Sequence, residues 1–236
     1  MASNLKIIKY LSTKLAPDCE IIKLNDSTRF DIVNYLSNPT NNRGLELGVA
    51  AGSFSKEMIG CNKFSTYIGI DAYLGVHKKE YLEALQVYGL ESKHKIIKGE
   101  FDQFHELFED KYFDFIYFDG FAHTGQDAGK TIKDYLPKLK KGGILAGDDY
   151  SDRWPLTKWL VLELSKQLNA QLYITQKIGM MAYSEHPSWF MIVQSHDVDV
   201  KFTKLFLILC YFEKQRIAFL RKIYIFPRII KKLISK

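Results

Sequence analysis

The chain has 236 residues, of which 47% are hydrophobic and 25% charged, and its net charge is +6. This is an ordinary globular composition with room for one substantial domain. Three widely spaced cysteines, Cys19, Cys61 and Cys210, argue against a disulfide framework and a zinc site, and they favour a reducing, cytoplasmic setting.

The positive charge lies at the C-terminal end. Residues 201–236 contain ten Lys or Arg against one acid, Glu213, so this segment carries +9 and leaves −3 for residues 1–200. The basic residues therefore belong to an appendage, and the remaining chain lacks the basic pattern of a nucleic-acid-binding protein. At the other end, Lys6, Lys9 and Lys14 interrupt the apolar residues, so we expect no export signal.

Residues 1–40 are predicted to be a helical cover over the sheet edge or the cofactor pocket. The first helix spans residues 5–15. A second would begin at Asp26 or Ser27 and carry Phe30, Val33 and Leu36 at three-residue spacing.

From residue 43 onward, short apolar runs alternate with amphipathic segments such as 78–90 and 127–139. The apolar runs are residues 44–49, 66–70, 94–98, 113–118, 143–146, 171–175 and 189–194. This alternation predicts a doubly wound, Rossmann-like α/β fold with a seven-stranded, mostly parallel sheet. The last two runs are separated by a short loop and would place an antiparallel strand at one edge. We therefore expect one domain over residues 1–200 and a basic amphipathic helical tail over 201–236.

The segment GLELGVAAGSFS, residues 44–55, has the character of a ligand-binding loop. It places Glu46 and Gly48 at the end of the first run, and Gly52 at the turn into a helix that Ser53 would cap. Ligands of open α/β sheets bind at these strand ends. A dinucleotide loop reads G-x-G-x-x-G, but Ala50 and Ser53 stand at its second and third glycines. Since S-adenosylmethionine has no pyrophosphate to accommodate, the substitutions favour this methyl donor.

Two later strand ends extend the donor site. TYIGID ends in Asp71, where a carboxylate would accept both ribose hydroxyls, and HKIIKGE ends in Glu100, which would contact the adenine edge. Each signal alone is weak, and their order along the chain strengthens them. The predicted donor-binding residues are Glu46, Gly48, Ala50, Gly52, Ser53, Asp71, Ala72, Glu100, Phe101 and Asp119.

Residues 43–150 resemble a class I S-adenosylmethionine-dependent methyltransferase. The stretches ELGVAAGS, YIGID, FDFIYFDG and LKKGGILAGDDY are similar to macrocin-type sugar O-methyltransferases and, more distantly, to catechol O-methyltransferase. The resemblance covers about half of the chain. It implies methylation of a hydroxyl on a sugar, a nucleotide-sugar or a related small molecule, as in surface-polysaccharide biosynthesis. The alternatives are an N-methyltransferase acting on a small amine without metal, and a non-methylating dehydrogenase or binding module.

Acidic residues follow two further strands. Asp119 ends one run, and Asp148 and Asp149 end the next. The resemblance implies Asp119 and Asp149 as ligands of a divalent metal, with Asp148 as the third candidate, and oxygen ligands suit Mg²⁺, Mn²⁺ or Ca²⁺. Such a metal would help to deprotonate the acceptor hydroxyl. The alternative is that Asp148 and Asp149 cap a helix or bind the donor and acceptor directly.

A general base is the alternative to a metal for removing the proton of the acceptor hydroxyl. His123 and Asp119 are the candidate catalytic residues, because an imidazole ordinarily titrates near neutrality. Many relatives read D-G-x-H, whereas Phe121 and Ala122 both intervene here, which shifts the imidazole by one residue. His123 could instead have only a packing role.

The segment after Asp149 would overhang the acceptor. Tyr150, Arg153 and Trp154 could hold a sugar ring or a phosphate, and such residues serve packing equally often.

The tail contains only eight unbroken apolar residues, 205–212, far short of the roughly 20 that span a bilayer. Its later part alternates apolar and basic residues. We consider packing on the domain or in a homodimer, peripheral contact with the inner membrane surface, and nucleic-acid binding, which the rest of the chain does not favour.

Overall fold

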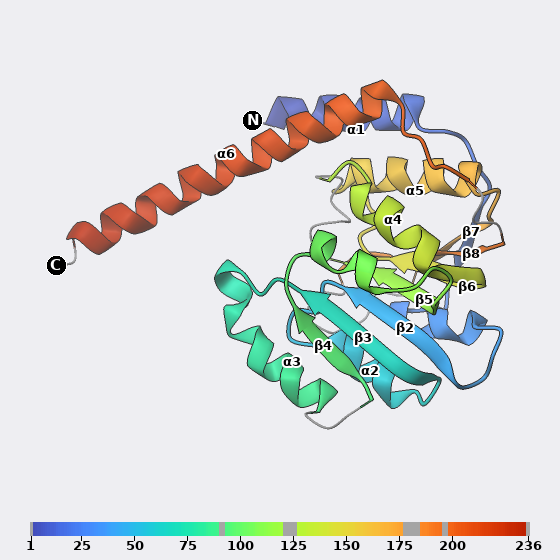
Figure 1. Ribbon diagram of the computed structural model, residues 1–236. Helices are drawn as coiled ribbons and strands as arrows, with labels where there is room; N and C mark the ends of the chain where they lie inside the picture. Colours follow the sequence, from blue (N-terminus) through green and yellow to red (C-terminus); the bar gives the residue numbers. More distant parts are fainter. Residues whose placement is uncertain (1, 90–92, 120–126, 177–184, 195–197, 235–236) are drawn as a thin grey trace.

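The computed structural model describes residues 2–89, 93–119, 127–176, 185–194 and 198–234, with side chains from residue 6 to residue 219 except at Val76. The described residues form an α/β fold around one eight-stranded sheet (Figure 1), with the strand order β1-β7-β8-β6-β5-β2-β3-β4. The predicted doubly wound, mostly parallel fold is confirmed.

The predicted apolar runs coincide with seven of the strands. The strands are β1 Ile21–Leu24, β2 Asn42–Leu47, β3 Phe64–Asp71, β4 Lys95–Lys98, β5 Phe113–Phe118, β6 Leu139–Gly147, β7 Leu172–Thr175 and β8 Trp189–Val193.

Helices connect and cover these strands. The α-helices are α1 Ala2–Leu15, α2 Ser53–Gly60, α3 Glu80–Tyr88, α4 Lys130–Tyr135, α5 Pro155–Gln167 and α6 Lys204–Ile234. The 3₁₀ helices are η1 Arg29–Tyr35, η2 Gly75–Lys78, η3 Phe101–Gln103, η4 His105–Leu107 and η6 Leu136–Lys138.

Two details of the predicted sheet are wrong. The described sheet has eight strands, because β1 forms within the segment expected to be helical and pairs in parallel with β7. The antiparallel strand β8 therefore lies inside the sheet, between β6 and β7, and not at its edge. Four residues are too few to show a clear period in the sequence, so the edge strand becomes visible only through its partner.

The second predicted helix is the 3₁₀ helix η1. Its residues recur at three-residue spacing, which is the period of a 3₁₀ helix. Thr28 is its N-cap: the Asp31 carboxylate accepts from the Thr28 backbone N–H at 2.7 Å, and the Thr28 hydroxyl accepts from the Phe30 N–H at 3.3 Å. The helix therefore begins after Thr28, with Arg29 as its first residue, and not at Asp26 or Ser27.

The sheet has helices on both faces (Figure 1). Because side chains alternate along a strand, Leu45 and Leu47 of β2 join the core under α1, α4, α5 and α6. The opposite core lies under η1, α2 and α3, and Tyr67 belongs to it. The side chain of Glu46 points to this second face, so its neighbours in the site are residues of the second core.

Helix α6 has 31 residues and two distinct parts. Its first turns pack on the body through Phe206, Leu209 and Cys210, all of which are buried. Its later part extends away from the body (Figure 1). Among the described residues, no helix is long and apolar enough to cross a membrane.

Candidate functional site

The candidate site lies where the central parallel strands end. Backbone hydrogen bonds tie neighbouring strand ends together: Gly48 N–H donates to Ile70, Asp119 N–H to Leu47, and Asp148 N–H to Phe118. The residues that follow β2, β3, β5 and β6 are therefore held side by side at one edge.

Asp71 holds the loop that follows β2. Its Oδ2 accepts from the backbone N–H groups of Val49 and Ala50 at 2.9 and 3.0 Å, and its Oδ1 accepts from the N–H of Tyr73 at 2.9 Å. The Tyr73 hydroxyl donates to the Ala50 carbonyl at 3.0 Å. The predicted ribose ligand is thus also the residue that sets the loop conformation. A carboxylate oxygen has two lone pairs, so Oδ1 retains capacity for a ligand hydroxyl.

The loop has a left-handed backbone at three positions. The φ angles of Gly48, Ala50 and Gly52 are 95°, 50° and 84°. At Gly52 a Cβ would lie 3.3 Å from Cγ2 of Val87 in α3, so the loop passes close to that helix. Ala50 adopts this conformation with a side chain, at a cost that the Asp71 and Tyr73 hydrogen bonds offset. The prediction that Ser53 caps α2 is wrong: Gly52 is the N-cap, and no side chain among the described residues caps it.

Glu46 lies behind the loop with 1% of its surface exposed. The Ser55 hydroxyl and the Tyr67 hydroxyl donate to its Oε2 at 2.7 and 3.1 Å, and the Tyr88 hydroxyl donates to Ser55 at 3.1 Å. Burial raises the pKa of Glu46 to about 8, although the Ser55 hydrogen bond and the Arg29 charge lower it. The carboxyl is therefore mostly neutral at pH 7. Sequence reasoning found Glu46 but missed the three hydroxyl groups, which come from separate elements.

The remaining predicted donor residues lie beside Asp71. The Gly99 N–H donates to the Asp71 carbonyl at 3.0 Å, which brings Ala72, Glu100 and Phe101 to adjacent strand ends. Glu100 is exposed and Phe101 is half-buried. Their contact with a donor stays a prediction.

An arginine that sequence reasoning missed joins the acidic strand ends. Nη1 of Arg29 donates to Oδ2 of Asp148 at 2.8 Å, and Nη2 donates to Oδ2 of Asp119 at 3.3 Å. Ser188 donates to the other Asp148 oxygen at 2.8 Å. Arg29 is 6% exposed and Asp148 is 3% exposed. Burial raises the pKa of Asp148, and the Arg29 charge opposes this rise and favours the ionised carboxylate.

This arrangement does not fit a divalent metal. Both oxygens of Asp148 already accept hydrogen bonds, and a guanidinium lies where a cation would bridge Asp119 and Asp148. Within the part of the chain that the structure describes, no three His, Cys, Asp or Glu side chains are grouped to hold a metal ion. Asp149 follows directly with a left-handed φ of 59°. The metal ligands inferred from the resemblance are therefore not supported by the geometry.

The other predicted acceptor residues have different surroundings. His123 lies outside the described residues. Tyr150 packs against the α1 and α5 side of the core, with Lys158 Nζ 5.4 Å from its ring centroid. Arg153 is largely exposed, 5.6 Å above the Trp154 ring. Their contact with an acceptor stays a prediction.

Comparisons with known proteins identify the family and the fold. Residues 23–194 match the model of a family described as a methyltransferase domain. No curated protein is similar enough in sequence to match.

Solved structures of low sequence identity share the fold. An O-methyltransferase from Bacillus cereus in complex with SAH has a TM-score of 0.52 and 13% identity, over 81% of this chain and 90% of that one. A cofactor-bound protein from Mycobacterium tuberculosis has a TM-score of 0.53 and 14% identity, over 82% and 91%. A candidate caffeoyl-CoA O-methyltransferase from Staphylococcus aureus has a TM-score of 0.52 and 18% identity, over 80% and 91%.

Proposed function

Because the chain belongs to the methyltransferase family whose model it matches over residues 23–194, we propose that it transfers a methyl group from S-adenosylmethionine to a hydroxyl of a small molecule. The enzyme is an S-adenosylmethionine-dependent methyltransferase, so the dehydrogenase and binding-module alternatives fall away. The observation that carries the proposal is the loop of residues 48–52, which Asp71 holds beside the Asp119 strand end.

The donor would bind along this edge. Its amino-acid end would lie over the loop, near Glu46 and the first turn of α2. Its ribose would donate to Asp71, and its adenine would lie by Ala72, Glu100 and Phe101. Gly48 and Gly52 leave room for close approach because they carry no side chain.

The acceptor would lie beyond the donor methyl group, next to Asp119. Methyl transfer is an in-line displacement: the acceptor oxygen bonds to the methyl carbon, the carbon–sulfur bond breaks, and S-adenosylhomocysteine leaves. The hydroxyl proton must pass to a base. Asp119 is the candidate among the described residues, since its side chain is 23% exposed at the rim, and His123 is the second candidate.

Oxygen is the favoured acceptor atom for two reasons. A carboxylate at the rim can accept a hydroxyl proton, and structures of the same fold include the O-methyltransferase from Bacillus cereus. Tyr150, Arg153 and Trp154 would favour a sugar or nucleotide-sugar, through ring contact and a cation for phosphate.

The test is methyl transfer from deuterium-labelled donor to a panel of sugars, nucleotide-sugars, phenols and amines, read by mass spectrometry. We expect a labelled methyl group on a hydroxylated acceptor. Transfer to amines alone would overturn O-methylation. Calorimetry with S-adenosylhomocysteine tests the donor site separately: Asp71→Asn should weaken binding, whereas Asp110→Asn, an exposed acid paired with Lys138, should not.

A further inference from the structure

Arg29 links two carboxylates that belong to different strand ends. It reaches Asp148, which is 119 residues away in the chain, and Asp119, which is 90 residues away. The guanidinium also lies over the rings of Phe54 and Tyr117, at 4.6 and 5.2 Å from their centroids. Two hydrogen bonds and two aromatic rings thus hold the Arg29 guanidinium beside the two acidic strand ends.

The chain around Arg29 is itself fixed. The Thr28 and Asp31 capping interactions begin η1 at Arg29, so its side chain starts from a defined backbone. Phe54 lies in the first turn of α2, directly after the donor loop, and stacks on Tyr117 at 4.1 Å between ring centroids. Arg29 therefore contacts both the helix that follows the donor loop and the acidic acceptor rim.

We propose that Arg29 takes the place of a divalent metal at the acceptor end, so that methyl transfer by this chain needs no metal ion. Arg29 is a positioning residue: it neutralises Asp148 and turns the more exposed Asp119 toward the acceptor hydroxyl. A Mg²⁺ ion requires oxygen ligands at about 2.0–2.1 Å with near-octahedral geometry. A second cation at these carboxylates would also be repelled by the guanidinium.

This proposal rests on the proposed function, but metal binding tests it without an acceptor. Mn²⁺ titration of the full chain, followed by electron paramagnetic resonance, should show no stoichiometric binding. Activity should be undiminished in EDTA. One bound Mn²⁺ that Asp119→Asn removes, or activity lost in EDTA and restored by Mg²⁺, would overturn the proposal and leave O-methylation standing.

Variants separate positioning from folding. Arg29→Gln should lower kcat by about 10- to 100-fold with little change in donor KM. Arg29→Lys keeps the positive charge but lacks the two guanidinium nitrogens that donate to Asp148 and Asp119. It should therefore recover part of the lost kcat. The matched control is Arg43→Gln. Arg43 is an exposed arginine near the start of β2, at the opposite edge of the sheet, and its guanidinium also lies over a ring, 4.4 Å from the centroid of Tyr112. An unchanged kcat in folded Arg29→Gln would contradict the positioning role.

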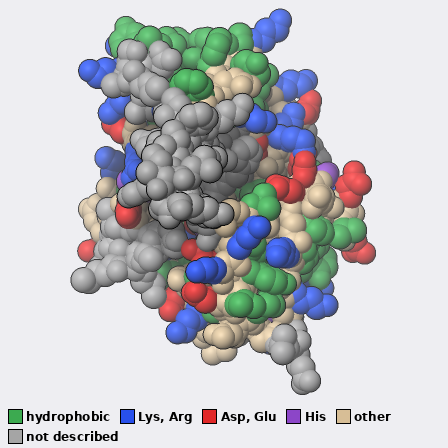
Figure 2. Space-filling view, turned by 90° about the vertical axis from the view of Figure 1, so that its left-hand side faces the viewer, with side chains coloured by type: hydrophobic (Ala, Val, Ile, Leu, Met, Phe, Trp, Pro, Cys, Tyr) green, Lys and Arg blue, Asp and Glu red, His purple; other side chains and the backbone are tan. Residues whose placement is uncertain are grey.

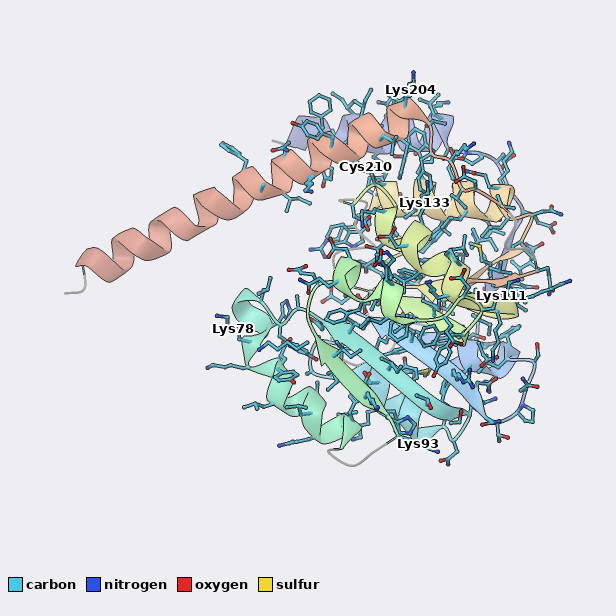
Figure 3. The ribbon with its side chains drawn as sticks, viewed as in Figure 1. Lys78, Lys93, Lys111, Lys133, Lys204 and Cys210 are labelled. Carbon is cyan, nitrogen blue, oxygen red and sulfur yellow. The ribbon has the colours of Figure 1, made fainter. Side chains whose placement is uncertain are left out.

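A separate observation concerns the outer side of α6. The inward positions are buried, while apolar side chains on the other positions are 42–61% exposed: Leu207, Ile208, Tyr211, Phe212 and Phe219. Figure 3 shows Cys210 on the side facing the body and Lys204 pointing away from it. Hydrophobic side chains gather at the top of Figure 2, where Figure 1 places α1 and the first turns of α6.

Helix α1 adds to the same side of the molecule. It packs on α5, as α6 does, and it leaves Ile7 54% and Tyr10 63% exposed. Its lysines Lys6 and Lys9 are exposed as well. The α1–α6 face, defined here as Ile7, Tyr10, Leu207, Ile208, Tyr211 and Phe212, is thus apolar with basic neighbours.

We infer that the α1–α6 face docks on an anionic membrane surface. Residues 201–236 carry +9, so two copies meeting through this face would bring two strongly positive segments together, whereas anionic headgroups complement them. With 31 residues, α6 is about 46 Å long, and its later part extends away from the other described helices and from the sheet (Figure 1). Apolar side chains beside lysines are the pattern of a helix lying in the interface plane.

Vesicle sedimentation of the full chain tests this inference and needs neither donor nor acceptor. We expect binding to vesicles that contain phosphatidylglycerol, weak binding to phosphatidylcholine alone, and loss of binding at high salt. Ile208→Ser with Phe212→Ser should reduce binding at least about fivefold. The control is Leu82→Ser in α3, where Leu82 is 66% exposed. Equal binding by both variants, or a dimer in light scattering that the double variant breaks, would overturn the inference.

Discussion

Donor binding should release a proton from Glu46. With a pKa of about 8, Glu46 is about 90% protonated at pH 7. The ammonium group of the donor, if it binds beside Glu46 as proposed, favours the carboxylate and lowers this pKa toward its ordinary value of 4.5. Binding at pH 7 should then release about 0.9 proton from this residue.

The sign follows from the direction of the shift. The free protein holds the proton and the complex does not, so affinity rises with pH. The rise is about tenfold per pH unit between the ordinary pKa and about 8, and it levels off above that. Glu46→Gln should fold, because a neutral amide replaces a neutral acid and its oxygen still accepts from Ser55 and Tyr67.

Isothermal titration calorimetry at pH 7 in two buffers of different ionisation enthalpy measures the proton count. The Glu46→Gln variant supplies the control, since it reports the protons exchanged by the donor's own amino group and by other residues. The difference between the two proteins should be about one proton. Equal proton release by both would refute the reasoning, and Glu46 would then serve only the hydroxyl cluster.

Two further predictions concern packing. Gly69→Ala would place a Cβ 2.2 Å from the Tyr88 hydroxyl and 2.6 Å from Cγ2 of Val49, so urea unfolding should show a loss of about 1–3 kcal/mol. Gly60→Ala, which meets nothing within 4 Å, should cost no stability, and equal losses would refute the packing argument. Cys210 is fully buried, and burial raises the pKa of its thiol. It should therefore resist thiol reagents in the native protein, and rapid native-state labelling would show that the first turns of α6 leave the body.

Much of the fold follows from local pattern. Seven of the eight described strands coincide with apolar runs, because a strand in a sheet that is covered on both faces favours a continuous apolar stretch whatever its neighbours are. The glycines of residues 48–52 and the acids at strand ends also lie within short segments. The sequence therefore predicts the positions of the loop of residues 48–52 and of the acidic residues at the strand ends.

The protonation and ion pairing of those side chains depend on contacts between segments that are far apart in the sequence. Glu46 looks like a charged ligand in the sequence, but it is buried in the fold, and burial raises its pKa to about 8 although the hydrogen bonds from Ser55 and Tyr67 lower it. Strand β1 is recognisable as a strand only from its pairing with β7.

The acidic rim shows the same division. The sequence by itself determined that Asp119 and Asp148 end neighbouring strands, since that follows from local runs of apolar residues. Only the tertiary structure decided that Arg29 neutralises them, because the partner comes from a segment about a hundred residues away. Carboxylates that resemble a metal site in sequence thus form an ion-pair network when the N-terminal segment folds over the sheet.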